Sequence, residues 1–124
     1  KMGFDFIAIT DHRNYNASLE AVESFKNIKS DFLILPGEEV HPPDNYVHII
    51  NFGGKESINE KMKDGEAYRK EVEEIIQNLE DFPKFIDKYV YASCIWCFEK
   101  IRESGGLSIF CHPFWITKNI YNVP

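Results

Sequence analysis

The sequence predicts a mixed α/β fold in which at least some strands pair in parallel. Three short apolar runs occupy residues 6–10, 32–37 and 107–111, and such runs are typical of strands buried on both faces. Helical segments lie between them, so the predicted order is strand, helix, strand, strand, helices, strand. Each run stops at residues that bind metals, and the carboxyl ends of parallel strands gather at one edge of a sheet. The pattern therefore indicates one convergent site.

The first half of the chain contains three predicted strands and one helix. The opening strand ends at a Thr-Asp-His sequence. A helix over residues 17–28 follows, with Asn16 or Ser18 as its cap. The second strand covers residues 31–40 and ends in a proline-rich turn. A third apolar run over residues 46–52 closes at two glycines.

The second half of the chain predicts two long helices and one strand. An amphipathic helix is expected over residues 66–81. Pro83 suits the first turn of another helix, which we expect to end at Ser104 before two glycines. The last strand delivers His112, and the tail to Pro124 is predicted to be a loop. No repeat or linker divides the chain, so residues 1–124 are predicted to be part of a single domain.

Composition excludes several classes of function. Apolar residues make up 44% of the 124 residues, and the net charge is −6. No basic run is present, which disfavours a nucleic-acid partner, and no stretch approaches the roughly 20 apolar residues of a membrane span. The chain shows no secretory signal and has three cysteines, an odd number that favours a reducing cytoplasm.

One cysteine pair has two interpretations. Cys94 and Cys97 have the C-x-x-C spacing of redox and zinc sites. No second pair is present, and the surrounding apolar residues follow a helical spacing. We therefore predict that both thiols are small buried apolar groups.

Adjacent carboxylates follow the second strand. Because Glu38 and Glu39 are neighbours in an extended segment, their side chains point to opposite faces. Only one can face the site, and the other is expected at the solvent or rim. His41 lies on the same face as Glu39 and could join the site, but the turn that begins at Pro42 leaves this open.

The remaining candidates lie at the ends or starts of the other apolar runs. His12 is a candidate ligand, and Asp11 could orient an imidazole or merely cap a helix. His112 is followed by a proline, which favours an extended conformation for His112. His48 comes near the start of its run, so the strand-end rule does not explain it, and alone it resembles a core histidine. Arg13 could bind a phosphate through its planar guanidinium or could be a plain surface arginine.

Imidazoles combined with carboxylates suit zinc, manganese and iron. The sequence has no phosphate-binding loop, no dinucleotide fingerprint and no nucleophilic-serine motif. Metal-assisted hydrolysis is therefore the reaction class that these residues favour.

Four segments together resemble successive motifs of the polymerase and histidinol phosphatase (PHP) superfamily. Their order and approximate spacing match over nearly the whole chain. The segments are Ile-Thr-Asp-His at 9–12, Leu-Pro-Gly-Glu-Glu-Val at 35–40, His-Ile-Ile-Asn-Phe at 48–52, and the Gly-Gly to His-Pro-Phe stretch at 105–114.

The resemblance implies a distorted (β/α)7 TIM-like barrel that carries two or three zinc, manganese or iron ions. It implies hydrolysis of a phosphate ester by a metal-activated water. Carried over by position, His12, Glu39, His48 and His112 are the metal ligands, with Glu39 bridging two ions. Asp11 would orient the site from behind, and Arg13 would meet the phosphate. A small phosphorylated substrate is implied, although a sugar phosphate, a nucleotide, a compound like histidinol phosphate and a nucleic-acid end all remain open.

The chain also departs from the family pattern. No His-x-His motif precedes Lys1, no Asp-x-His motif follows His112, and Arg13 stands where family members usually have asparagine. We therefore expect residues 1–124 to be the central segment of a PHP domain, a partial barrel without its first and last strands. Such a segment should hold at most one well-formed ion site, at Glu39, His48 and His112, and should bind metal without efficient turnover.

Two further expectations follow from this interpretation. Unpaired strand edges and an exposed apolar interior predict self-association of the chain. Two alternatives stay open for its function. One is a non-catalytic PHP-like binding or regulatory module, and the other is a doubly wound binding domain whose histidines only satisfy hydrogen bonds.

Overall fold

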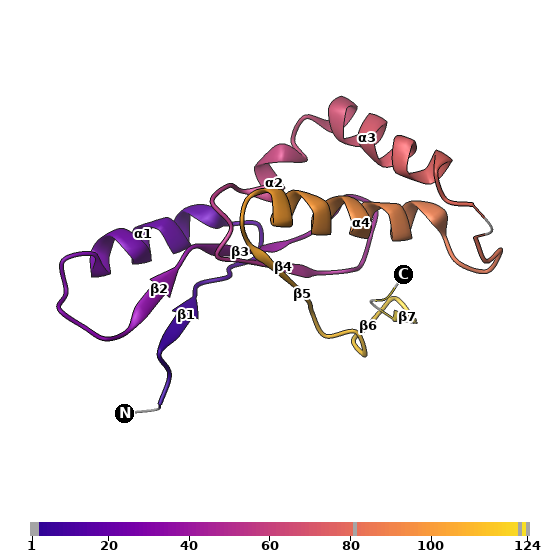
Figure 1. Ribbon diagram of the computed structural model, residues 1–124. Coiled ribbons are helices and arrows are strands. Elements are labelled where there is room, and N and C mark those ends of the chain that lie inside the picture. The colour runs from indigo at the N-terminus through magenta and orange to yellow at the C-terminus, as the bar shows by residue number, and fades with distance from the viewer. Residues whose placement is uncertain (1–2, 81, 122, 124) are drawn as a thin grey trace.

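The computed structural model describes residues 3–80, 82–121 and 123. Within this part of the chain, four helices and three small sheets form a mixed α/β arrangement in which no sheet closes into a barrel (Figure 1). The partial barrel therefore stays a prediction. None of the described helices is both long and apolar enough to cross a lipid bilayer. In chain order the elements are β1 (Phe6–Ala8), α1 (Tyr15–Phe25), β2 (Leu33–Leu35), β3 (Gly37–Val40), β4 (Ile49–Phe52), α2 (Ile58–Lys61), α3 (Gly65–Gln77), α4 (Lys88–Glu103), β5 (Leu107–Phe110), β6 (Ile116–Thr117) and β7 (Ile120–Tyr121).

The directions of the strands determine which strand ends lie next to one another. β1 pairs with β2 in parallel, and a parallel bridge between His12 and Glu39 continues the chain after β1 alongside β3. β4 runs antiparallel to both β3 and β5, so β3 and β5 point the same way. The ends of β3 and β5 therefore meet the start of β4 at one edge of the sheet.

The predicted strand over residues 31–40 is two strands that belong to different sheets. Pro36 separates them, because proline lacks the N–H that a continuous ladder needs. Gly37 then lies so close to the neighbouring strand that a Cβ on it would come 2.9 Å from the carbonyl oxygen of Asn51. The Gly37 N–H donates to Oγ of the buried Ser18 on α1 at 2.9 Å. This bond attaches α1 to the point where the chain changes sheets.

The helices begin at different residues from those predicted. α1 is capped by Asn14, whose side-chain oxygen accepts from the Ala17 N–H at 3.3 Å, so neither Asn16 nor Ser18 is the cap. α4 begins at Lys88 after an Asp87 cap rather than near Pro83. α3 ends at Gln77, and residue 81, the predicted end of that helix, lies outside the described residues.

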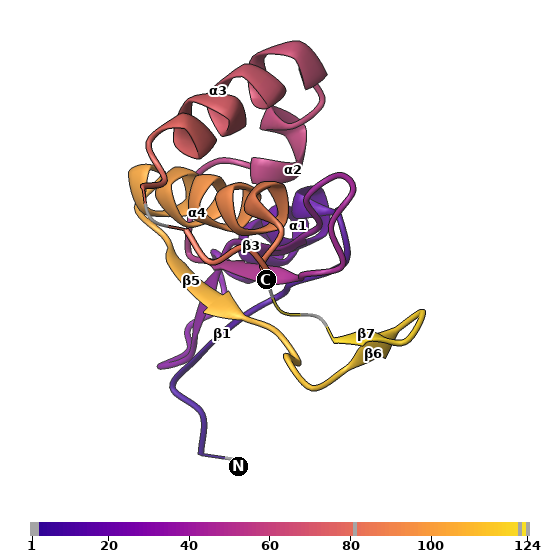
Figure 2. The same ribbon diagram turned by 90° about the vertical axis from the view of Figure 1, so that its right-hand side faces the viewer.

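The core lies between the three-stranded sheet and the helices. α4 packs on β4 and β5, and α3 packs on the outer side of α4 (Figures 1 and 2). Tyr68 of α3 and Trp96 of α4 meet edge to face with ring centroids 4.9 Å apart, a favoured aromatic geometry. Cys94 and Cys97 are buried in this cluster as free thiols, which confirms the prediction that they are core residues.

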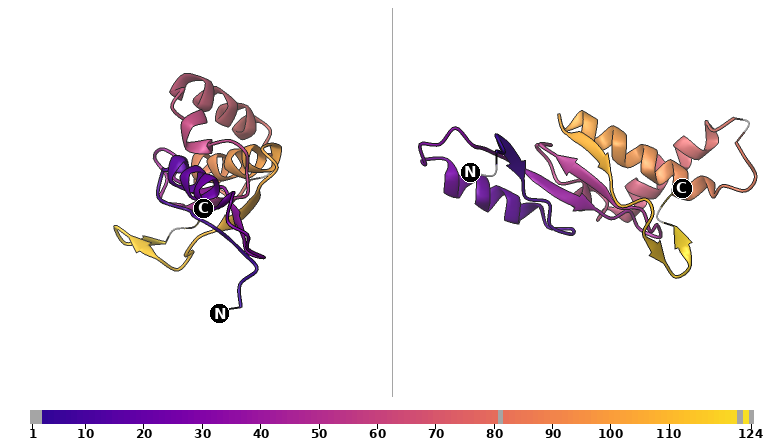
Figure 3. Two further views of the ribbon diagram at one scale, coloured as in Figure 1. Left: turned by 90° about the vertical axis from the view of Figure 1, so that its left-hand side faces the viewer. Right: turned by 90° about the horizontal axis from the view of Figure 1, so that it is seen from below.

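On the opposite face of the strands, no helix of the described residues packs (Figure 1 and the right panel of Figure 3). Apolar side chains on this open face are exposed. Phe6 is 54% exposed, Leu33 55%, Leu107 69% and Ile109 49%. The pairing register places Glu39, Ile50 and Ile109 side by side across the three strands. Glu39 therefore belongs to the open face.

The tail is not the loop that was predicted. β6 and β7 form a short antiparallel hairpin. Its turn residues Lys118 and Asn119 both have positive φ angles, of 50° and 66°, which is the backbone twist of a tight hairpin turn. Residues 122 and 124 lie outside the described part of the chain.

Candidate metal centre

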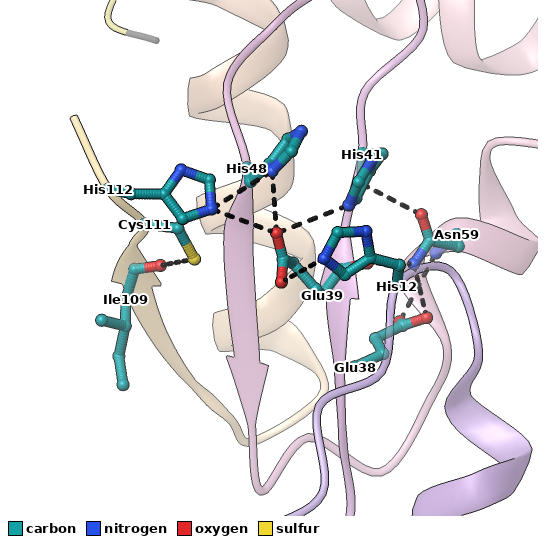
Figure 4. Close-up of polar contacts among 9 residues, drawn as sticks. All are labelled: His12, Glu38, Glu39, His41, His48, Asn59, Ile109, Cys111 and His112. Carbon is teal, nitrogen blue, oxygen red and sulfur yellow. Dashed lines mark hydrogen bonds and ion pairs between the residues drawn. The ribbon is translucent and has the colours of Figure 1, made fainter. Parts of the chain in front are cut away.

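The carboxylate of Glu39 is surrounded by all four histidines of the chain (Figure 4). Its side chain is 10% exposed. The distances between the carboxylate oxygens and the imidazole nitrogens are 3.2 Å from Oε2 to His12 Nε2, 3.5 Å from Oε1 to His41 Nε2, 2.8 Å from Oε1 to His48 Nδ1 and 3.4 Å from Oε1 to His112 Nε2.

Cross-strand pairing explains why His48 faces the site. One step beyond the Val40–Ile49 pair, His41 lies opposite His48, and their rings stack with centroids 3.8 Å apart. Because β4 runs antiparallel to β3, its first residues lie beside the last residues of β3. The strand-end rule could not place His48 because that rule holds for parallel strands only.

His112 reaches the site through a turn in the backbone. Its φ angle is +24°, so the extended conformation predicted from Pro113 is wrong. Continued alternation along β5 would place residue 112 on the face that packs against α4. The positive φ breaks this alternation, and the imidazole Nε2 of His112 lies 3.3 Å from His48 Nδ1.

Glu38 is not the solvent or rim carboxylate that was predicted. It points to the opposite face from Glu39, as adjacent strand residues must, but it is 0% exposed. Its Oε2 accepts from Ser57 Oγ at 2.9 Å and from Asn59 Nδ2 at 2.7 Å, and its Oε1 accepts from the N–H of Ile58. Glu38 therefore holds the start of α2 against β3.

Asn59 links this buried network to the site. Its Nδ2 donates to the backbone carbonyl of Glu39 at 3.1 Å, and its Oδ1 accepts from the N–H of His41 at 3.1 Å. The backbone on both sides of Val40 is thereby fixed by one side chain. The carboxylate of Glu39 and the imidazole of His41 consequently project from a rigid strand end.

Two polar atoms of the site are buried without a hydrogen bond. Oε1 of Glu39 lies within ion-pair distance of three imidazoles, yet it accepts no hydrogen bond of normal geometry among the described residues. Nε2 of His41 is likewise buried and unpartnered there, and its side chain is 12% exposed. Buried polar atoms without partners are costly and rare in proteins, and such atoms at a cation site gain their partner from the ion.

Burial makes two of the imidazoles weak bases. Desolvation, together with the charge of His48, lowers the pKa of His41 to about 4. Desolvation also lowers the pKa of His48 below its ordinary value, against the opposing effect of Glu39. Both rings are therefore neutral at pH 7, which is the form that binds metals.

Asp11 and Arg13 lie at the edge of the site. Asp11 contributes its backbone carbonyl, which accepts from the Glu39 N–H at 3.0 Å. Its carboxylate makes no hydrogen bond to a site histidine among the described residues, so the structure gives no support for the predicted orienting role. Arg13 has a φ of +53° and donates its N–H to the Glu39 carbonyl at 3.0 Å.

Two residues of the cluster received little or no weight from the sequence. His41 was ranked below His48, and Cys111 was not considered as a ligand. One donor atom from each of Glu39, Cys111 and His112 lies within 4.8 Å of the others. Burial raises the pKa of the Cys111 thiol to about 11. The Cys111 N–H donates to the His48 carbonyl at 3.0 Å, just beyond the paired ends of β4 and β5. This pairing brings Cys111 to the site, and no local sequence pattern records it.

The donor set fits a divalent ion. Ligand bonds of about 2.0–2.1 Å in a tetrahedral shell place neighbouring donors about 3.4 Å apart. The distances of 3.3 Å from His48 to His112 and 3.4 Å from His112 to Glu39 match this spacing. The distance of 2.8 Å from His48 to Glu39 is shorter, so these two groups would separate slightly on binding.

The comparisons find no matching family model, no matching curated protein and no matching solved structure.

Proposed function

We propose that this chain carries the divalent-metal centre of a PHP-type phosphoesterase that hydrolyses a small phosphorylated substrate. The observation that supports this most strongly is the convergence of four imidazoles on the single buried carboxylate of Glu39. Four of the clustered residues come from four segments that resemble separate PHP motifs, namely His12, Glu39, His48 and His112. A convergence of this kind is expected if the segments form one site, and a bound ion would give a partner to the two buried polar atoms that have none among the described residues.

Glu39, His48 and His112 would hold the ion through Oε1, Nδ1 and Nε2. Three protein ligands with an open position are typical of catalytic sites. A bound ion of this type supplies Lewis acidity toward a phosphoryl oxygen and lowers the pKa of a coordinated water. The protein contributes the rigid strand ends, the neutral imidazoles and a carboxylate largely shielded from solvent.

Arg13 is the cation best placed to bind a substrate phosphate. It lines a surface hollow of about 320 Å³ together with His41 and Lys63. Lys63 is paired with Glu60 at 2.6 Å, whereas no carboxylate in the described part of the chain lies within ion-pair distance of Arg13. An unpaired guanidinium beside a metal centre suits a phosphate dianion, which it can bind through two parallel hydrogen bonds.

We propose a cytoplasmic protein. All three cysteines are free thiols in the structure, and unpaired thiols suit a reducing compartment.

Metal-dependent cleavage of p-nitrophenyl phosphate tests this function. We expect slow hydrolysis that requires added Zn²⁺ or Mn²⁺ and is lost in His112→Gln. Arg13→Gln should weaken competition by inorganic phosphate while leaving metal content unchanged. Arg102→Gln, which removes an exposed arginine of α4 outside the hollow, is the matched control. Metal binding without any hydrolysis would instead favour the non-catalytic binding module, and activity in the presence of a chelator would contradict the proposal.

A further inference from the structure

Of the three cysteines, two lie in the core and one lies at the candidate metal centre. Cys94 and Cys97 are buried in the hydrophobic cluster, whereas Cys111 directly follows β5 and is only partly buried. Figure 4 shows the Sγ atom of Cys111 on the His112 side of the Glu39 carboxylate. The proposed function gives this thiol no role.

Sheet pairing explains why Cys111 faces the site. Its N–H donates to the carbonyl of His48 at 3.0 Å, one step beyond the paired ends of β4 and β5, so Cys111 lies opposite His48. Alternation along an extended strand places Cys111 on the same face as Ile109, and Ile109 shares the open face with Glu39. The backbone therefore puts the thiol on the face that carries the carboxylate.

The thiol has the spacing of a metal ligand. Sγ of Cys111, one carboxylate oxygen of Glu39 and one imidazole nitrogen of His112 lie within 4.8 Å of one another. In a tetrahedral zinc shell, a sulfur ligand and a nitrogen or oxygen ligand stand about 3.6 Å apart, because the zinc–sulfur bond is about 2.3 Å long. The three groups would therefore draw together only slightly around an ion.

The oxygen of Glu39 that lacks a partner is an independent indication of a ligand. The side chain of Glu39 is 10% exposed, and its Oε1 has no hydrogen bond among the described residues. Cys111 does not satisfy this oxygen, because the hydrogen bond that its Sγ makes is a long one of 3.8 Å to the carbonyl of Ile109. Thiols are weak donors. An ion between Glu39 and Cys111 would give both groups a strong partner.

We propose that Cys111 is a thiolate ligand of the single ion held by Glu39, His48 and His112. The inference rests on the proposed function and deepens it, because a soft thiolate selects zinc over the harder manganese ion. On binding, the S–H bond breaks, a sulfur–metal bond forms and the proton passes to the buffer. A fourth protein ligand completes a tetrahedral shell, so the thiolate would compete with substrate for the open position.

Cobalt absorption spectroscopy tests the inference. Co²⁺ replaces zinc as the probe, because a cobalt–thiolate bond gives a near-ultraviolet charge-transfer band that nitrogen and oxygen ligands do not give. We expect this band when Co²⁺ is added to the reduced 124-residue chain, and we expect it to be absent in Cys111→Ser. Cys94→Ala removes a thiol that lies in the core, and this matched control should keep the band.

Metal selectivity gives a second readout. The affinity for Zn²⁺, measured by isothermal titration, should fall at least about 10-fold in Cys111→Ser, whereas the affinity for Mn²⁺ should stay nearly unchanged. If Cys111→Ser fails to fold, the unchanged chain still provides a test. Zn²⁺ should protect Cys111 from alkylation by iodoacetamide, with the modified cysteine identified by mass spectrometry, and no protection would contradict the inference.

The outcomes separate this inference from the proposed function. Cobalt that binds without the sulfur band, or with a band that persists in Cys111→Ser, would overturn the thiolate ligand and leave the proposed function standing. A band that persists in full in His112→Gln would also overturn it, because the thiol would then bind metal apart from this centre. No binding of cobalt or zinc by the unchanged chain would overturn both.

Discussion

Oε1 of Glu39 lies 2.8 Å from Nδ1 of His48. Glu39 belongs to β3, and His48 directly precedes β4, which runs antiparallel to β3. The carboxylate is nine-tenths buried and the imidazole is mostly buried. The pair is thus a preformed polar centre. Its environment determines how the stability of the metal-free chain should depend on pH.

Stability of the metal-free chain should fall as the pH is lowered from about 6.5 to about 4. The folded protein lowers the pKa of His41 from 6.5 to about 4, so in this window the unfolded chain binds a proton that the folded chain does not. The contribution of His41 to the free energy of unfolding is fully present above pH 6.5, the pKa of the imidazole in the unfolded chain. It is lost as the pH falls to about 4, the pKa in the folded chain. The upper bound is of order 3 kcal/mol.

Urea denaturation at a series of pH values in the presence of a chelator measures this effect. In His41→Gln the slope of unfolding free energy against pH should decrease between those two values. The lowered pKa of His48 should leave a smaller residual slope of the same sign. An unchanged slope in His41→Gln would show that His41 is not buried as a neutral ring.

Glu38→Gln should destabilise the fold by about 2–4 kcal/mol. Four donors surround the carboxylate: two backbone N–H groups, Ser57 Oγ and Asn59 Nδ2. In the variant, an amide NH₂ replaces one of the two acceptor oxygens. At least one buried donor is therefore left without an acceptor. Chemical denaturation measures the loss. Glu60→Gln, an exposed change in the adjacent α2, should stay within about 0.5 kcal/mol. A near-neutral Glu38→Gln would mean that the network is not formed.

Gly37→Ala should destabilise the chain and weaken zinc binding together. An added Cβ would lie 2.9 Å from the carbonyl oxygen of Asn51 and 3.1 Å from that of Ile9, so the start of β3 must shift. Glu39 follows two residues later and would move with it. Gly65→Ala is the matched control, because a Cβ there meets nothing within 4 Å and alanine favours a helix. Equal stability of the two variants, measured by thermal unfolding, would contradict this account.

The open sheet face should drive self-association. Leu107 and Ile109 are exposed on β5, whose outer edge is unpaired in the described structure, and contiguous exposed apolar side chains on an edge strand promote pairing between chains. Light scattering should show that the apparent molecular mass increases with protein concentration, and Ile109→Thr should reduce this increase. Leu19→Gln removes an exposed apolar residue on α1, away from the open face, and should leave the increase unchanged. A monomer at high concentration would refute the prediction.

The sequence predicted the opposite facing of the two adjacent carboxylates on β3 but not the burial of Glu38. Alternation along β3 correctly placed Glu38 and Glu39 on opposite faces, because that rule depends only on extended geometry. Alternation could not show that Glu38 would be buried. Its partners are Ser57, which caps α2, and the first two residues of α2, a helix too short to have a periodic signal. The burial of Glu38 is therefore determined by tertiary contacts.

His48 and His112 illustrate two other limits of the sequence. The direction of β4 depends on its pairing with β3 and β5, which no local pattern records, so His48 could be ranked only by resemblance. Pro113 restricts the residue before it, yet His112 adopts a positive φ. Backbone conformations of this kind cost energy and are enriched at functional sites, which is why a propensity rule fails there.

Zinc binding by the unchanged chain and by Glu39→Gln tests the central claim most directly. The carboxylate of Glu39 lies within 3.5 Å of an imidazole nitrogen of every histidine, and a neutral amide in its place removes the negative charge that a bound ion would meet. Isothermal titration with Zn²⁺ should show binding to the unchanged chain that weakens by at least about 100-fold in Glu39→Gln, more than the loss usual for a group that only supports a ligand. Equal zinc affinity of the two proteins, or no binding by either, would contradict the account.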